Sequence, residues 1–310
     1  VKRSIETSLF KIENKSLKKK NLDDYEFIGS SNTIIKVKQL IDKVAPTSSR
    51  VIIYGNSGTG KDLVAKEIHK RSKYSSGNFI IVNSALLEPE GIEEELFGLE
   101  ENSRIIKTGF FEQANNGTLF IDEIGDMPIQ TQSKILRVLT DSSFYRVGSN
   151  IPVNINARLL CSSTENLEKL VEEGNFRMDL FHRLNVVSIT LPNLSDRTQD
   201  INELIEYFSK IYLTNSSSKI SDLRDYITTN YINYDWPGNV RELRNIIERY
   251  CIIGVRIAEN HEQLDSGFNS KNVISMPLKN ARRIFEKNYL ESQIQRFNGN
   301  ISKTASFIGM

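Results

Sequence analysis

The sequence is poor in cysteine and has no long apolar run. Its 310 residues include only two cysteines, Cys161 and Cys251, which argues against a disulfide framework or a cysteine metal site and favours a reducing cytoplasm. The longest apolar pieces, "FIIV" and "CIIGV", are far shorter than the roughly 18 residues that a membrane-spanning helix needs. The start of the chain is charged, unlike a signal peptide. We therefore expect a cytoplasmic protein that does not enter a membrane.

Neither sign of charge dominates overall, since the net charge is +1 and 25% of residues are charged. The distribution is uneven, however. Residues 1–20 carry seven Lys or Arg against two Glu, and residues 276–310 carry six against two, so the middle of the chain is acidic. Electrostatic attraction to nucleic acid is therefore expected at the two ends rather than in the centre.

Short apolar runs alternate with helical patterns between residues 21 and 190. The runs "RVIIYG", "NFIIVN", "GTLFID", "RLLCSS" and "NVVSIT" have the continuous apolar character of strands that are buried on both faces. Helices between such strands imply a parallel sheet with right-handed crossovers. The pattern breaks at "LPNLSDR", after which residues 200–255 have only helical patterns. The sequence thus predicts an α/β domain followed by a helical one.

The remaining parts of the chain are expected to be linkers and a further helical segment. Val1, Ile5, Leu9 and Ile12 recur at helical spacing, which indicates a short linker helix able to dimerise. A polar stretch from His261 indicates a second linker. The expected boundaries are 1–20 for the linker helix, 21–190 for the α/β subdomain, 191–256 for the helical subdomain, 257–275 for the linker and 276–310 for the last segment.

The motif "GNSGTGKD" follows a predicted strand and opens a predicted helix, which is the context that a phosphate-binding loop requires. Its glycines let backbone N–H groups turn inward around phosphate oxygens. Lys61 supplies a positive charge, and the helix N-terminus adds its dipole. Asp62 stands where Ser or Thr usually meets Mg²⁺. We expect ATP to contact Gly55, Asn56, Ser57, Gly58, Thr59, Gly60, Lys61 and Asp62.

A second motif, "GTLFIDEIGDMP", places two acids where a buried strand ends, at the edge where ligands bind in open α/β sheets. Asp122 is expected to hold Mg²⁺, and Glu123 to orient and deprotonate the attacking water. Arg177 and Arg183 precede the last predicted strand. They are either solvated helix arginines or, as we expect here, fingers that reach the γ-phosphate of a neighbouring subunit.

Seven motifs occur in order: "GNSGTGKD", "ELFG", "GFFEQANNGTLFIDEIGDMP", "KILRVL", "FYRVG", "FRMDLFHRLNVV" and "WPGNVRELRN". Over residues 27–249 the chain resembles the central ATPase domain of bacterial enhancer-binding proteins, the NtrC-type activators of sigma-54 RNA polymerase. The motif "TQSKILRVL" and a shortened loop resemble their NtrX branch. The resemblance implies an AAA+ P-loop NTPase with a parallel sheet, a helical lid and a ring oligomer, expected to be a hexamer.

The resemblance also implies roles for individual residues. Asn83 matches the asparagine that holds the catalytic glutamate according to nucleotide state, and Arg241 matches a lid arginine that touches the bound nucleotide. Ser163 and Thr164 stand where the family has a Thr-Asn sensor pair, which predicts weakened hydrolysis. An acidic residue at the position of Asp62 is common in this family, so Asp62 is expected near the metal with Asp122.

Both ends of the chain fit a two-component response regulator. The first helix resembles a linker that follows a receiver domain, through which a sensor histidine kinase acts. The segment "NGNISKTASFIGM" resembles the start of a Fis-type helix-turn-helix, with Ala305 and Gly309 suited to tight helix packing and the turn. The recognition helix is expected after Met310. We therefore expect a fragment of a longer promoter-binding regulator that by itself binds DNA poorly.

The loop after "ELFG" departs from the family. Activators carry a "GAFTGA" motif there, which engages sigma-54, whereas residues 99–108 read "LEENSRIIKT". Three interpretations follow: a DNA-binding regulator whose oligomerisation ATP controls, an activator that engages sigma-54 through the shortened loop, or a remodelling ATPase with another protein target. A pseudo-ATPase that binds nucleotide only as structural support is a fourth. We favour the first, with slow hydrolysis that depends on protein concentration.

Overall fold

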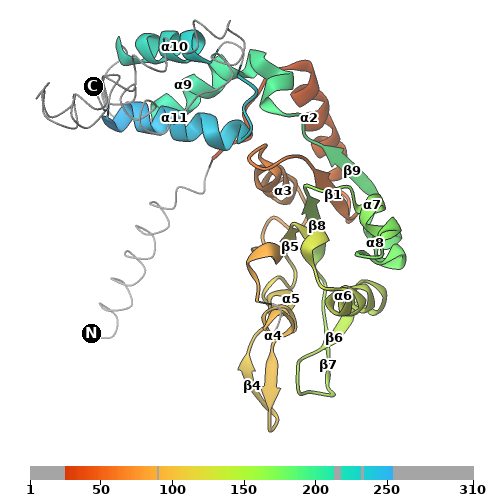
Figure 1. Cartoon of the computed structure of the whole chain (residues 1–310). Helices are drawn as coiled ribbons and strands as arrows, with labels where there is room; N and C mark the ends of the chain where they lie inside the picture. Colours follow the sequence, from red (N-terminus) through yellow and green to blue (C-terminus); the bar gives the residue numbers. More distant parts are fainter. Residues whose placement is uncertain (1–24, 89–90, 213–217, 232–233, 254–310) are drawn as a thin grey trace, which may run out of the picture. The chain divides into compact units, whose positions relative to one another are not determined.

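The computed structural model describes residues 25–88, 91–212, 218–231 and 234–253. The expected linker helix 1–20, the linker 257–275 and the segment 276–310 lie outside these ranges. Within the described ranges no helix is both long enough and apolar enough to span a bilayer. The described part of the chain comprises an α/β core and a group of three helices that follows it (Figure 1).

A five-stranded parallel sheet forms the centre of the core, as the apolar runs predicted. Its strand order is β2-β5-β8-β1-β9. The register pairs Ile52 with Cys161 and with Ser188, and Asn83 with Asp122. The strands are β1 (Val51–Tyr54), β2 (Phe79–Asn83), β5 (Thr118–Asp122), β8 (Arg158–Ser163) and β9 (Val187–Thr190).

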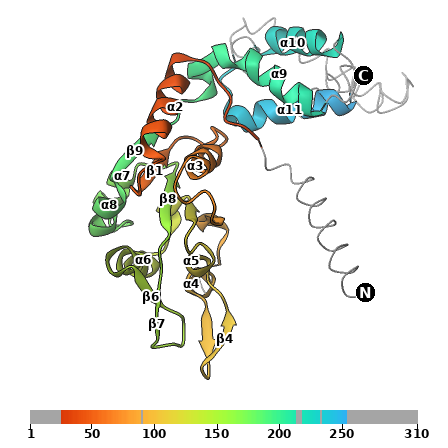
Figure 2. The ribbon, with the colours of Figure 1, turned by 180° about the vertical axis from the view of Figure 1, so that it is seen from behind.

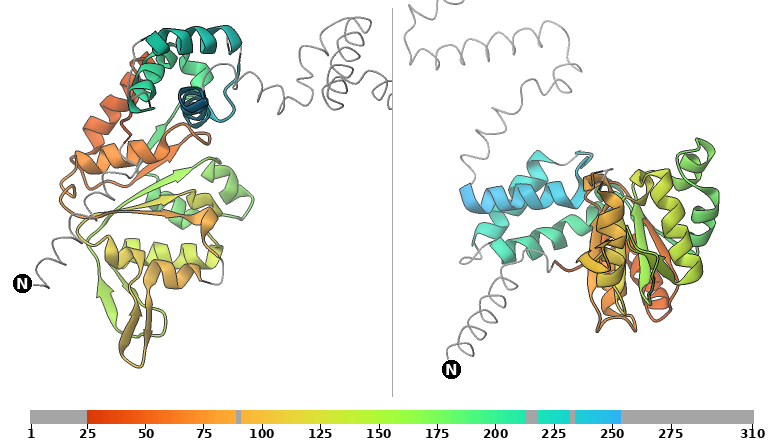
Figure 3. Two further views of the ribbon diagram at one scale, coloured as in Figure 1. Left: turned by 90° about the vertical axis from the view of Figure 1, so that its left-hand side faces the viewer. Right: turned by 90° about the horizontal axis from the view of Figure 1, so that it is seen from below.

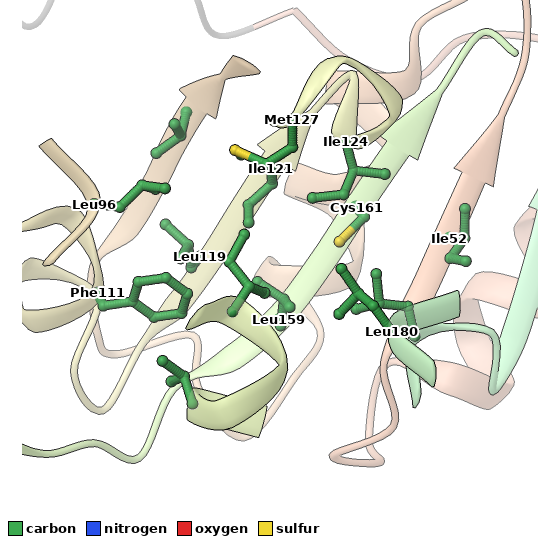
Figure 4. Packing of buried hydrophobic residues seen from close by; sticks show 14 of the residues in the cluster. Ile52, Leu96, Phe111, Leu119, Ile121, Ile124, Met127, Leu159, Cys161 and Leu180 are labelled. Carbon is green, nitrogen blue, oxygen red and sulfur yellow. The ribbon is translucent and has the colours of Figure 1, made fainter. Parts of the chain in front are cut away.

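Two hydrophobic clusters cover the two faces of this sheet, because successive strand residues point to opposite sides. Leu119 and Ile121 pack into one cluster, as does Ile52 (Figure 4). Phe120 and Ile53 belong to the other. Helices lie on both sides of the strands (Figure 3). Helices α2 (Asn32–Val44) and α3 (Lys61–Lys70) contribute to the second cluster; α4 (Ile92–Phe97), α5 (Phe110–Gln113), α6 (Ile129–Asp141), α7 (Leu167–Glu172) and α8 (Met178–Leu184) contribute to the first.

Two antiparallel hairpins extend from the same end of the core (Figures 1 and 2). The first, β3 (Leu99–Glu101) and β4 (Arg104–Lys107), occupies the shortened loop, so that segment is a defined hairpin. Its turn residues Asn102 and Ser103 have φ of 49° and 62°, as a two-residue hairpin turn requires. The second comprises β6 (Ser143–Tyr145) and β7 (Pro152–Asn154). Backbone hydrogen bonds of Val147 with Gly98 and Glu100 join the two hairpins.

The helical subdomain begins after η3 (Leu194–Asp200), two 3₁₀ turns that are separated by a kink at Arg197. The sequence pattern predicted only a break here. Its helices are α9 (Ile201–Tyr212), α10 (Ser218–Asn230) and α11 (Asn239–Ile253). Tyr25 connects the start of the core to this subdomain. Its hydroxyl lies 3.1 Å from that of Tyr212, its ring packs edge-on against Phe208, and Arg244 lies over the ring. The chain entering the core is therefore fastened to α9 and α11.

Candidate functional site

The predicted site residues come from the carboxyl ends of neighbouring parallel strands. The phosphate loop follows β1, Asn83 ends β2, Asp122 ends β5 and Thr164 follows β8. Because these ends meet at one edge of the sheet, the parallel topology brings the separate motifs together. Gly58 and Gly60 have φ of 78° and 101°, a left-handed conformation that glycine adopts without penalty.

Lys61, Glu123 and Thr164 form one hydrogen-bonded cluster beside the phosphate loop. Lys61 Nζ lies 2.9 Å from Glu123 Oε1 and donates to the Gly55 carbonyl at 2.8 Å and to Thr164 Oγ1 at 2.9 Å. The Thr164 hydroxyl and backbone N–H donate to the Glu123 carboxylate at 2.6 and 2.7 Å. An ammonium group has three donors, and all three of Lys61 are used here. An incoming phosphate must therefore replace some of these contacts.

The surroundings shift the pKa values of the two acids of the second motif, Asp122 and Glu123, in opposite directions. Burial would raise the pKa of Glu123, but hydrogen bonds from Thr164 and Lys61 together outweigh it, so the pKa lies below its ordinary value. Burial raises the pKa of Asp122 despite a hydrogen bond from Ser162. Ser162 Oγ donates to Asp122 and accepts from the Glu123 N–H at 3.0 Å. Glu123 is thus ionised at neutral pH but occupied by its partners in this arrangement.

The carboxylates of Asp122 and Asp62 suit a magnesium ion that is bound partly through water molecules. One Asp122 oxygen accepts from Ser162, and the other accepts from Asn83 Nδ2 at a long 3.4 Å. Asp62 is exposed and its charge acts on Asp122. Mg²⁺ typically keeps several waters and takes one or two carboxylates plus substrate phosphates, which these two acids can provide. Asn83 lies against Asp122, and its oxygen accepts from the Ala85 N–H, so in this arrangement it does not bond to Glu123.

The segment after Trp236 packs against the phosphate loop. The N–H groups of Val240 and Arg241 donate to the Gly58 carbonyl at 3.0 and 3.3 Å, and Arg241 Nη1 donates to Ser57 Oγ at 3.1 Å. Asn239 is buried; its amide donates to the Ser57 carbonyl, and its oxygen accepts from the Leu194 N–H. A side chain at Gly58 would collide with the Gly238 carbonyl. The lid thus contacts the loop through backbone as well as through the predicted arginine.

Arg177 and Arg183 bond to α6 and to their own helix rather than to the phosphate loop. Arg177 donates to Asp179 at 2.7 and 3.1 Å and to Ser133 at 3.1 Å. Arg183 donates to the Leu139 carbonyl at 3.2 Å. Among the described residues, the hydrogen bonds of both arginines are made away from the phosphates' expected position. In this arrangement residues of α6 and α8, rather than the phosphate loop of the same chain, hold both side chains.

The resemblance assigned Ser163 and Thr164 together to the sensor pair, and the structure separates them. Ser163 is buried and donates to the backbone carbonyl of Glu165, whereas Thr164 contacts Glu123 and Lys61. Ser162 and Asn239 were missed. Ser162 was detectable as the strand residue next to the sensor pair, on the opposite face of the sheet from Ser163. Asn239 is the last residue of the motif "WPGN", but the sequence does not indicate that it bonds to Ser57 of the phosphate loop, since that contact depends on the fold.

A parallel sheet with a phosphate loop, paired acids and a helical lid defines the AAA+ class of P-loop NTPases. The sequence matches the family described as "Sigma-54 interaction domain" over residues 27–190 and the family described as "AAA+ ATPase lid domain" over residues 195–272. It is 39% identical to the nitrogen assimilation regulatory protein NtrX of Azorhizobium caulinodans, over 99% of this chain and 71% of the relative. It is 42% identical to the DNA-binding transcriptional regulator NtrC of Proteus hauseri, over 71% of this chain and 48% of the relative.

Solved structures agree with the sequence comparison. NtrX from Brucella abortus in complex with ADP is 40% identical and has a TM-score of 0.72, over 100% of this chain and 71% of that one. The same protein in complex with ATP has a TM-score of 0.68. This chain belongs to the NtrC-type family of regulators with a sigma-54 interaction domain, in the NtrX branch.

Proposed function

We propose that the chain binds and hydrolyses ATP at the cluster of Lys61, Glu123 and Thr164. The observation that carries this proposal is that a buried lysine of the phosphate loop, a general base candidate and a sensor side chain meet within hydrogen-bonding distance. In our proposal the phosphates displace Glu123 from Lys61, which frees the carboxylate to accept a proton from water. Thr164 keeps the carboxylate oriented while this happens.

The other site residues have supporting roles in the proposal. Asp122 and Asp62 would hold Mg²⁺, which would neutralise the phosphate charge that develops during transfer. Ser162 orients Asp122. Arg241 would contact the nucleotide from the lid, since it already bonds to Ser57 of the loop. Asn83 would switch its contact between the acids with nucleotide state.

Hydrolysis is proposed to require a second subunit. Arg177 and Arg183 lie on α8 and its N-cap and bond to neighbours outside the loop of their own chain, so they suit fingers that act in trans. An arginine finger contributes roughly 10³–10⁵ in rate. ATP binding would therefore be linked to ring assembly, with a hexamer proposed from the family resemblance.

The regulatory output proposed is control of transcription through promoter DNA, with ATP controlling the oligomer. The family relationship supports a cytoplasmic two-component regulator that responds to a sensor histidine kinase. We also propose that the chain is organised as a linker helix, an α/β subdomain, a lid, a second linker and a helix-turn-helix segment. The cationic excess of residues 276–310 supports DNA contact in that segment.

A second candidate function is sigma-54 activation through the β3–β4 hairpin. The hairpin exposes Ile105 and Ile106, which are 54% and 58% accessible, and exposed apolar side chains on a defined hairpin suit a protein contact. Replacing both with serine, with Ile151→Ser on the second hairpin as control, separates the candidates. Loss of sigma-54-dependent transcription at unchanged ATPase rate would support the second candidate; unchanged transcription would support the first.

The ATPase proposal is tested by titrating ADP into the parent chain and Lys61→Ala and then measuring phosphate release from ATP. Lys61→Ala should abolish both binding and release, because the β- and γ-phosphates lose their cation. Equal binding by the two proteins would refute the assignment of the loop. Binding without any release at high protein concentration would favour a structural role for the nucleotide.

A further inference from the structure

The η3 segment that connects β9 to α9 contains two buried charges. Arg197 is 2% exposed and Asp200 is fully buried. Asp200 is well partnered, because it accepts from the backbone N–H groups of Ser30 and Ser31 and from the Ser31 hydroxyl, at 2.7 to 2.8 Å. These bonds fasten η3 to the turn that precedes α2. They account for the burial of Asp200, but they do not involve Arg197.

Arg197 bonds to the phosphate loop. Its Nη2 donates to the Thr59 carbonyl at 3.0 Å, although the two residues are far apart in sequence. Its Nε is buried and has no hydrogen-bond partner among the described residues. Burial lowers the pKa of the guanidinium, and the charge of Asp200 offsets part of that effect. Burying a cation with an unpaired N–H group costs free energy of folding. The hydrogen bond from Arg197 to Thr59 therefore indicates a role for this arginine beyond stability.

The Thr59 carbonyl is part of the peptide that joins Thr59 to Gly60. A peptide is planar and trans, so its C=O and N–H point in opposite directions. When Arg197 holds the Thr59 carbonyl, the Gly60 N–H must face away from Arg197. Within the part of the chain that the structure describes, this N–H has no hydrogen-bond partner. It stands directly before α3, which begins at Lys61, where backbone N–H groups bind phosphate.

We propose that Arg197 is a positioning residue for the phosphate loop. It holds the Thr59–Gly60 peptide in the orientation that presents the Gly60 N–H to a nucleotide phosphate. Because Arg197 lies in the connection between the core and the lid helices, it also links that connection to the loop. This inference rests on the proposed nucleotide binding at Lys61.

The chain offers a matched control for removing a buried arginine. Arg158 is also 2% exposed, and it donates to the carbonyls of Val44, Ala45 and Ser49 at 2.8 to 3.2 Å. It begins β8, at the opposite edge of the sheet from the phosphate loop. Arg158→Met therefore removes an equally buried arginine together with its three hydrogen bonds, without touching the loop.

The test is an equilibrium titration of fluorescent ADP, with ATP turnover measured beside it, on the full chain. Arg197→Met should raise the Kd for ADP by about 10-fold per folded molecule, the effect of losing one charge-assisted hydrogen bond. The KM for ATP should rise similarly while kcat changes less. Arg197→Lys keeps the cation and should recover part of the loss. Arg158→Met should lower the Tm without raising the Kd.

The outcomes distinguish this inference from the function on which it rests. If the parent binds no more tightly than Lys61→Ala, the proposed nucleotide binding is wrong. If the parent binds and folded Arg197→Met binds equally well, the positioning role is wrong. Should Arg197→Met not fold, Arg197→Gln decides, because it removes the charge but keeps a long polar side chain: a raised KM at retained kcat supports the role, and a parental KM refutes it.

Discussion

Replacing Glu123 with glutamine separates two effects of this residue, its contact with Lys61 and its proposed role as general base. The substitution keeps the shape of the side chain and an oxygen that can accept from Thr164. It removes the charge that lies 2.9 Å from Lys61 Nζ. We therefore expect hydrolysis to fall, because the general base is lost, while ATP binding becomes tighter, because Lys61 no longer has a competing anion.

The size of each effect follows from the geometry. At 2.9 Å the direct attraction is about 6 kcal/mol at an effective dielectric constant near 20. Desolvation offsets most of it, and a hydrogen bond to a charged group is worth a net ~1.5–3 kcal/mol. Since the Glu123 side chain is 23% exposed, the lower end applies, which predicts roughly 10-fold tighter ATP binding. Loss of a general base predicts a rate reduced by about 10²–10⁴.

The assay combines ATP titration with phosphate release for the parent, Glu123→Gln and Glu165→Gln. Glu165 is exposed, and the hydrogen bond that it makes to Ser163 uses its backbone carbonyl, so its variant controls for the lost charge. It should behave like the parent. If Glu123→Gln hydrolyses ATP as fast as the parent, Glu123 is not the general base. If it stops hydrolysis but binds ATP no more tightly, the Lys61 contact does not compete with phosphate.

Substitutions at three further positions test individual features. Burial raises the pKa of Asp122 in the folded protein, so its ionisation costs stability once the pH is above that pKa. Without nucleotide, Asp122→Asn should therefore have a higher Tm than the parent at high pH, by an amount that shrinks as the pH falls through the raised pKa. Tyr25→Phe should cost about 1 kcal/mol of stability, the value of its hydroxyl contact with Tyr212, whereas Tyr25→Ala should cost more because the ring contacts with Phe208 and Arg244 also go; equal losses in chemical denaturation would contradict this. Ser103→Gly should stabilise the hairpin by roughly 0.5–1 kcal/mol, because Ser103 has positive φ, and a lowered Tm would argue against the turn.

The sheet, and the edge of it at which the site residues lie, were predictable because the sequence patterns that indicate them are local. Each buried strand reads as an apolar run, and the glycines of the phosphate loop and the Asp122–Glu123 pair follow their strands directly in sequence. The parallel topology then brings these strand ends together without further information.

Contacts between distant segments were not predictable. Arg197 in "LSDR" gives no sign that it bonds to Thr59 in the phosphate loop, because that contact depends on how η3 folds. The pairing of Asn83 with Asp122 depends on side-chain orientation, for which the local sequence gives no signal. The hairpin over residues 99–107 was missed because its turn uses Asn102 and Ser103 rather than glycine.

The most direct test of the proposed trans-acting ATPase is its rate per subunit as a function of protein concentration. The parent, Arg177→Ala and Arg183→Ala would be compared with Arg137→Ala, an exposed arginine on α6. We predict a rate that climbs steeply with concentration for the parent and Arg137→Ala and collapses in both finger variants. A rate per subunit that is independent of concentration, or that survives both finger substitutions, would contradict the proposal.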